Sequence, residues 1–169
     1  MRRYPMRLLA ATLAGSILAG AACAQEGKLL LYTSQPNTDA QQTIDAFRAR
    51  FPKVEVSFVR DGTPRIMAKL QAEFAAGQAQ PDVLLIADSV TMEALKRDNR
   101  LLAHPGAAVA AYDAALHDKD RTWFSTKLIT TGIVYNARAP MVPTSWADLA
   151  KPEARGQLAM PSPLASGAA

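Results

Sequence analysis

The chain has 169 residues, of which 49% are hydrophobic, and this suffices for one globular domain with a hydrophobic core. Its formal charge of +4 overstates the basic character, because removing Arg2, Arg3 and Arg7 from the 19 Lys and Arg leaves 16 against 15 Asp and Glu. Lys and Arg are nowhere interleaved with aromatic residues in a stripe, so we expect no nucleic-acid-binding surface.

Residues 1–24 have the pattern of a secretory signal peptide. A basic start precedes an apolar stretch over residues 8–22, which is short for a membrane span, and Ala22-Cys23-Ala24 fits the small-x-small cleavage rule. We predict cleavage before Gln25, which removes the only cysteine and places a disulfide-free protein in the periplasm. The alternatives are an uncleaved anchor helix, twin-arginine export through Arg2-Arg3, and a lipidated Cys23.

The mature chain begins with an apolar run over residues 28–33, which predicts a first strand. A helix should follow, because apolar residues recur at helical spacing up to Phe51-Pro52, where the helix ends. Asn37 or Thr38 is the expected N-cap. The apolar face of this helix consists of Ala40, Ile44, Phe47 and Phe51.

A second strand is predicted over residues 54–58, where apolar and polar residues alternate. Thr63-Pro64 reads as an N-cap followed by proline at the first helical position, and Gly77 as the end of that helix. The helix carries an apolar stripe of Ile66, Leu70 and Phe74.

The third strand is the unbroken apolar run Val83-Leu84-Leu85-Ile86, which is typical of a strand covered on both faces. It leads through Ala87-Asp88-Ser89 into a helix that extends to about Asp98, with Asp88 or Ser89 as N-cap.

This order of strands and helices predicts an α/β fold with a parallel sheet and right-handed crossovers. The strand-to-helix loops at 33–38, 60–63 and 87–89 then lie at one edge of the sheet, where open α/β sheets bind ligands. We therefore expect ligand contacts from the small polar residues of these loops: Ser34, Gln35, Thr63, Asp88 and Ser89.

The pattern is weaker beyond Leu101. We expect a short helix within 107–116, β structure over 123–136 interrupted by Thr130-Thr131-Gly132, a short capped helix at 145–149 and a brief strand at 158–160. A final Ser166 would cap a further helix, so the sequence is expected to stop within a domain. We divide the chain into a signal peptide (1–24), a first lobe (25–135), and a crossing segment with the start of a second lobe (136–169).

Six motifs in this order resemble one family. They are LLLYTSQP after the signal, AKLQAE at 68–73, PDVLLIAD at 81–88, TTGIVYN at 130–136, SWADL at 145–149, and GQLAMPSPLASGAA at the end. The chain resembles the solute-binding proteins of bacterial ABC importers, in the branch that carries ferric iron, 2-aminoethylphosphonate and related small anions. The resemblance covers residues 28–168 and implies a periplasmic-binding-protein-like fold of two lobes, of which this chain holds the first and the beginning of the second.

The resemblance also implies a function and a site. Ser166-Gly167-Ala168 matches a turn whose backbone N–H groups hold a phosphate-like oxyanion at a helix N-terminus, and Thr131 belongs to the same expected site. Asp88 would pair with an amino group of the ligand, although it could serve only as an N-cap. The expected partners are a small anionic solute, favoured to be a phosphonate or a phosphorylated metabolite, and an inner-membrane ABC permease, with the protein itself a monomer.

The alternative ligand is ferric iron bound with a synergistic anion. At the two positions where the ferric-binding relatives have a His and a Glu ligand, this chain has Pro36 and Ala87, neither of which offers a side-chain donor, so the metal ligands stay unknown. An enzyme is not expected, because no phosphate-binding glycine motif, nucleophile–histidine pair or carboxylate pair is present, and neither catalytic residues nor a cofactor are assigned. A secreted interaction module without a ligand is a third alternative.

Overall fold

The computed structural model describes residues 25–162 and 164–166 of the chain, so the predicted signal peptide lies outside the described residues, as do Gly167 and Ala168. Three strand–helix pairs follow one another along the chain, as expected from the sequence. They are β1 (Gly27–Thr33) with α1 (Asn37–Arg50), β2 (Val54–Arg60) with α2 (Thr63–Ala75), and β3 (Val83–Leu85) with α3 (Ser89–Arg97). None of the described helices is both long enough and apolar enough to cross a membrane.

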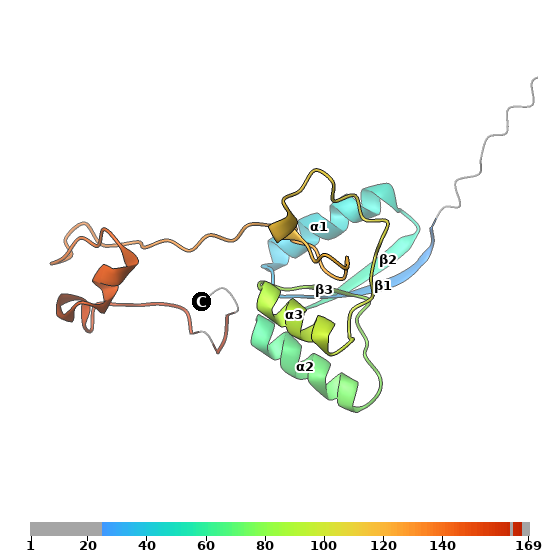
Figure 1. The fold of residues 1–169 in the computed structure, drawn as a ribbon, viewed down its shortest axis with the longest axis horizontal. Helices are drawn as coiled ribbons and strands as arrows, with labels where there is room; N and C mark the ends of the chain where they lie inside the picture. Colours follow the sequence, from blue (N-terminus) through green and yellow to red (C-terminus); the bar gives the residue numbers. More distant parts are fainter. Residues whose placement is uncertain (1–24, 163, 167–169) are drawn as a thin grey trace, which may run out of the picture.

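The three strands form one parallel sheet in the order β2-β1-β3 (Figure 1). β1 pairs with β2 along its whole length, from Gly27 opposite Val54 to Thr33 opposite Arg60. β3 pairs only with the end of β1, from Leu31 opposite Val83 to Thr33 opposite Leu85. The predicted parallel α/β fold is therefore confirmed.

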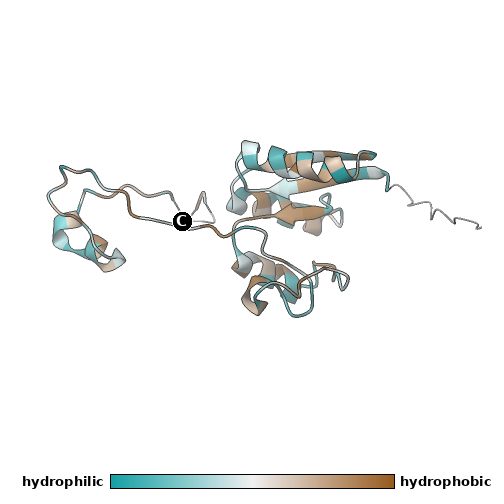
Figure 2. Cartoon of the chain, turned by 90° about the horizontal axis from the view of Figure 1, so that it is seen from above, coloured by the Kyte–Doolittle hydropathy of each residue, from teal (hydrophilic) through white to brown (hydrophobic). Residues whose placement is uncertain are grey.

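Helices cover the two faces of the sheet, with α1 on one side and α2 and α3 on the other (Figure 2). Since successive strand residues point to opposite faces, Leu31 packs with Ile44 of α1 while its neighbour Tyr32 reaches α2. The core on the α1 side contains Leu31, Ile44 and Val56, with Phe47, Phe58 and Leu85 packed against it. On the α2 and α3 side Ile66, Leu70 and Leu95 are buried.

A polar network ties β1 to α2 on this second face. The buried Tyr32 hydroxyl donates a 2.6 Å hydrogen bond to Glu73, which also pairs with Lys69 at 2.9 Å. Burial of the phenol and its hydrogen bond to the Glu73 carboxylate both raise the pKa of Tyr32. Tyr32, at 1% exposure, is thus a core residue.

Helix ends differ from the sequence predictions by one residue at two of the three N-termini. Pro36, rather than Asn37 or Thr38, precedes α1, and Gly62 is the N-cap of α2, so Thr63 is the first helical residue. At α3 the prediction is confirmed, because Asp88 accepts a 2.7 Å hydrogen bond from the Thr91 N–H. Gly77, with φ of 68°, follows α2 in a Schellman motif closed by the N–H groups of Gly77 and Gln78.

Beyond α3 the prediction of regular structure was largely wrong. The expected helix within 107–116 is reduced to the 3₁₀ turn η1 (Ala114–Leu116), and in 123–136 the only described β contact is a bridge of Phe124 to His117. The expected strand at 158–160 is not formed either. These stretches contain strand-forming residues, but a strand needs a neighbour for its backbone groups, and Val134 is 98% exposed.

Residues 123–129, the start of an extended arm, lie against the βα body; beyond them the chain leaves the body, reaches a small distal part, and returns toward the body (Figure 1). The distal part contains η2 (Trp146–Ala150) and η3 (Pro152–Ala154), and the predicted cap at Ser145 is confirmed as a capping box with Asp148. Hydrogen bonds from Lys151, Thr144 and Ser145 lower the pKa of the Asp148 carboxyl.

Candidate functional site

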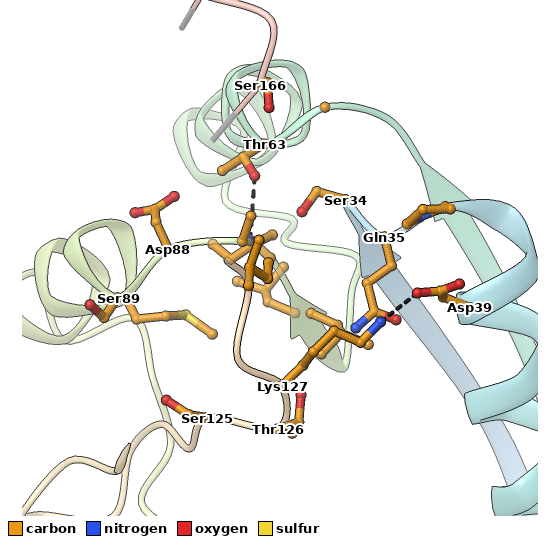
Figure 3. Close-up of a pocket in the computed structure, with 18 of the residues that line it drawn as sticks. Ser34, Gln35, Asp39, Thr63, Asp88, Ser89, Ser125, Thr126, Lys127 and Ser166 are labelled. Carbon is orange, nitrogen blue, oxygen red and sulfur yellow. Dashed lines mark hydrogen bonds and ion pairs between the residues drawn. The ribbon is translucent and has the colours of Figure 1, made fainter. Parts of the chain in front are cut away.

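A cavity of about 530 Å³ lies where the three parallel strands end and the three helices begin (Figure 3). Its walls come from five parts of the chain: the loops after β1, β2 and β3, the start of the arm at 123–129, and the returning residues Ala165 and Ser166. The expectation that the strand-to-helix loops share one edge of the sheet is therefore confirmed.

All three helix N-caps line this cavity: Pro36 of α1, Gly62 of α2 and Asp88 of α3. The first N–H groups of a helix have no partner within the helix, and the aligned peptide dipoles leave a partial positive charge at this end. Three such ends around one cavity favour a ligand that carries negative charge.

The loop after β1 is held by Thr33, whose side chain is fully buried. Its hydroxyl donates to the Leu85 carbonyl at 3.0 Å and accepts from the Gln35 N–H at 3.1 Å, while the Ser34 N–H donates to the same Leu85 carbonyl. Ser34 and Gln35 are thereby fixed at the cavity wall.

Two buried polar atoms on this wall lack a hydrogen-bond partner in the described part of the chain. They are Ser34 Oγ and Gln35 Oε1. Most buried polar atoms in folded proteins are paired, and leaving one unpaired costs about 1–3 kcal/mol. Both atoms belong to residues that line the cavity.

Thr63 and Asp88 occupy the two neighbouring loops. Thr63 is 4% exposed, and its hydroxyl accepts the Ala87 N–H at 3.5 Å, which joins the start of α2 to the end of β3. One carboxylate oxygen of Asp88 is used by the α3 cap, and no hydrogen bond of the other oxygen is observed within the described residues. The N-cap role is therefore confirmed, and it leaves an acceptor for a ligand.

The charged groups around the cavity balance. Arg60 donates from Nε to the Gln35 carbonyl at 3.0 Å, and Lys127 of the arm forms an ion pair with Asp39 in the first turn of α1 (Figure 3). The hydrogen bond and charge of Lys127 lower the pKa of the Asp39 carboxyl. With Asp88, the lining holds two cationic and two anionic side chains.

The remaining wall is apolar and partly aromatic. Leu84 to Ala87, Met92 and Phe124 contribute to it, together with Trp123, whose indole N–H donates to Glu93 at 2.8 Å. Such a wall suits the carbon skeleton of a ligand whose charged end meets the helix N-termini.

Six of the nine residues that the sequence suggested for binding meet at this cavity: Ser34, Gln35, Thr63, Asp88, Ser89 and Ser166. Thr131 does not, because it lines a second cavity of about 690 Å³, whose walls come from residues within 131–143 of the outgoing arm and 146–161 of the distal part and returning segment. Gly167 and Ala168 lie outside the described residues.

Sequence reasoning missed Asp39, Arg60, Lys127 and the aromatic pair Trp123 and Phe124. Arg60 is the first residue of the predicted loop 60–63 and could have been included. Lys127 carries no local signal, since its place beside Asp39 depends on how the arm crosses the body.

The two positions compared with iron ligands, Pro36 and Ala87, both lie on the cavity wall without a side-chain donor. Within residues 25–162 and 164–166, no three His, Cys, Asp or Glu side chains are grouped so as to hold a metal ion.

Comparison with known proteins supplies the family. Residues 33–169 match the family model described as bacterial extracellular solute-binding protein, which is most of the chain. The chain belongs to this family. No curated protein matches the chain at the significance required. The extracellular solute-binding proteins are components of transporters, and membership implies a small solute as ligand and an ABC permease as partner. It also implies a periplasmic or extracellular location, and the family is generally non-enzymatic.

Proposed function

We propose that this solute-binding protein captures a small organic anion, a phosphonate or a phosphorylated metabolite, for import by an inner-membrane ABC permease. The periplasm, reached through the signal peptide predicted at 1–24, is the corresponding location. The observation that carries the proposal is the convergence of three helix N-caps, with the unpaired Ser34 and Gln35 atoms, on one cavity.

The polar groups suit an oxyanion. Hydroxyl groups come from Ser34, Thr63 and Ser89, and Ser166 of the returning segment lies beside Thr63 (Figure 3). Hydroxyls and helix N–H groups donate to phosphate-like oxygens, and Arg60 and Lys127 supply full positive charge nearby.

Asp88 favours a ligand that also carries a positively charged amino group. Its carboxylate lies at the cavity wall on the far side from Gln35 (Figure 3), and an ammonium group on the solute could pair with it. A zwitterion such as 2-aminoethylphosphonate places opposite charges two carbons apart, which matches a cavity with both kinds of partner. Gln35 Oε1, an unpaired acceptor, also favours a ligand with a donor group.

Ferric iron with a synergistic anion is the competing ligand. Of the two carboxylates on the cavity wall, Asp39 is held by Lys127 and Asp88 caps α3. Ferric iron prefers several hard anionic oxygen ligands, so the described residues favour an anion over the metal.

The test is calorimetric titration of the full-length protein with 2-aminoethylphosphonate, O-phosphoethanolamine and ferric citrate. We expect binding of one or both phosphorus compounds, and binding of ferric citrate alone would refute the proposal. Ser34→Ala should weaken binding by about two- to tenfold, because it removes one hydrogen bond. It should leave the unliganded protein at least as stable as before, since the Ser34 hydroxyl has no partner to lose and its removal relieves an unpaired buried polar atom.

Ser57→Ala is the matched control. Ser57 lies on β2, is exposed and does not line the cavity, so the same chemical change should alter neither affinity nor stability. Equal affinities for the Ser34 and Ser57 variants would remove Ser34 from the site.

A further inference from the structure

The ion pair between Asp39 and Lys127 is the only described contact between charged side chains that joins the arm to the βα body at the cavity. Asp39 stands in the first turn of α1, and Lys127 lies 88 residues further along the chain. Both side chains are partly open to solvent, at 36% and 44% exposure, and both line the cavity.

Neither charged side chain depends on the ion pair alone for its stabilisation. Asp39 lies at the N-terminal end of α1, where the helix dipole stabilises a carboxylate, and it accepts a further hydrogen bond from Thr38 at 3.4 Å. Lys127 is a compact charge on a flexible stem, which allows its ammonium group to move between neighbouring acceptors. A partly exposed pair of this kind contributes little to stability, so breaking it costs little.

The charges around the cavity show why release of Lys127 from Asp39 would matter for binding an anion. While Lys127 is paired with Asp39, Arg60 is the other cationic side chain on the described wall. The negative charge of Asp88 on the same wall offsets the charge of Arg60. An oxyanion that enters the cavity needs a counter-charge, and Lys127 is within the same wall.

Resting on the function proposed above, we propose that Lys127 is an exchangeable anion-binding residue. Asp39 holds it in the empty site, and the negatively charged group of the solute takes the place of Asp39 in the filled one. Asp39 then acts as an internal competitor that lowers the affinity for anions and favours solutes with enough negative charge to displace it. The same exchange transfers the attachment of the arm from α1 to the ligand.

Two single substitutions separate exchange from a purely structural ion pair. Asp39→Asn removes the competitor, so affinity for 2-aminoethylphosphonate should rise by about two- to fivefold, which corresponds to a partly exposed ion pair. Lys127→Met removes the counter-charge, and affinity should fall by about tenfold or more. In the double variant the gain from Asp39→Asn should disappear, because no lysine remains to be released.

The measurement is calorimetric titration of the full-length protein and these variants with 2-aminoethylphosphonate and O-phosphoethanolamine. Asp45→Asn, an equal loss of charge on the exposed side of α1, is the control and should leave the affinity within twofold of the wild type. Asp39→Ser repeats the loss of charge with a smaller side chain, and thermal unfolding of each variant checks that it is folded.

The outcomes distinguish the two proposals. Opposite effects of Asp39→Asn and Lys127→Met support the exchange. A wild type that binds either probe while both substitutions weaken binding would refute the exchange and leave the proposed function standing. Failure of the wild type and of Asp39→Asn to bind either probe would refute the proposed function and the exchange with it.

Discussion

Replacing Gly62 by alanine tests how the returning segment meets the cavity. A Cβ placed on Gly62 would lie 2.3 Å from the Ala165 carbonyl oxygen, whereas ordinary contacts begin at 3.4 Å. The backbone of Gly62, at φ −61° and ψ 149°, is open to any residue, so the substitution acts through this contact and not through backbone strain.

Because a backbone carbonyl cannot rotate away as a side chain can, the Ala165–Ser166 segment must move by about 1 Å, the shortfall in the contact distance. This displaces Ser166 from the cavity wall, and loss of one hydrogen bond to the ligand should weaken binding by about two- to tenfold. The βα body itself should lose about 1 kcal/mol, because alanine is a poorer N-cap than glycine.

The assay combines calorimetric titration with 2-aminoethylphosphonate and NMR of the amide groups of Ala165 and Ser166. The matched control is Gly106→Ala, where the added Cβ meets only the His104 ring at an ordinary 3.7 Å. Unchanged amide resonances of Ala165 and Ser166 in the Gly62 variant, as in the control, would show that the segment does not lie against α2 as described.

Three further predictions concern the fold and the site. Asp88→Ala removes the acceptor for the Thr91 N–H, so its unfolding free energy, measured in urea, should fall by about 1 kcal/mol. Asp88→Asn keeps an acceptor and should lose less than half of that. Equal losses for the two variants would contradict the N-cap role of Asp88. Leu70→Ala, at a position only 1% exposed, should cost about 2–5 kcal/mol in the same assay, and a loss below 1 kcal/mol would contradict its place in the core. Burial raises the pKa of Asp118, but hydrogen bonds from Lys96 and Thr122 outweigh this effect and hold the pKa below its usual range. The ionised Asp118 carboxylate therefore stabilises the fold fully at pH values above its unfolded-state pKa. This stabilisation is lost as the pH falls through the pKa of Asp118 in the folded protein. Thermal unfolding between pH 7 and pH 2 should therefore show a smaller loss of stability on acidification for Asp118→Asn than for the wild type, and parallel curves would contradict this.

The sequence was sufficient to predict those elements whose cause is local or repeated. Period-two and period-3.6 patterns identified β2 and α2, and the run at Val83 identified β3. Given three βα units in succession, parallel pairing places the polar loop residues at one edge, which is why Ser34, Thr63 and Asp88 were found together.

The errors arose where structure depends on distant partners. Residues 123–136 contain strand-forming types, yet in the described structure no strand runs beside them, so their β propensity is not realised. Thr131 was expected in the site from the family resemblance and instead lines the second cavity. The Asp39–Lys127 pair and the approach of Ala165 to Gly62 join residues about a hundred positions apart, and no pattern within either segment indicates them.

The central position of β1 has a consequence for how the chain acquires its structure. β1 is the first of the described strands, but one of its edges is completed only by β3, more than fifty residues later. A growing chain that has not reached β3 therefore leaves backbone groups of Leu31 to Thr33 unpaired at that edge of β1, where Leu31 and Tyr32 are buried in the finished sheet. The described βα body can therefore be completed only after β3 has been synthesised.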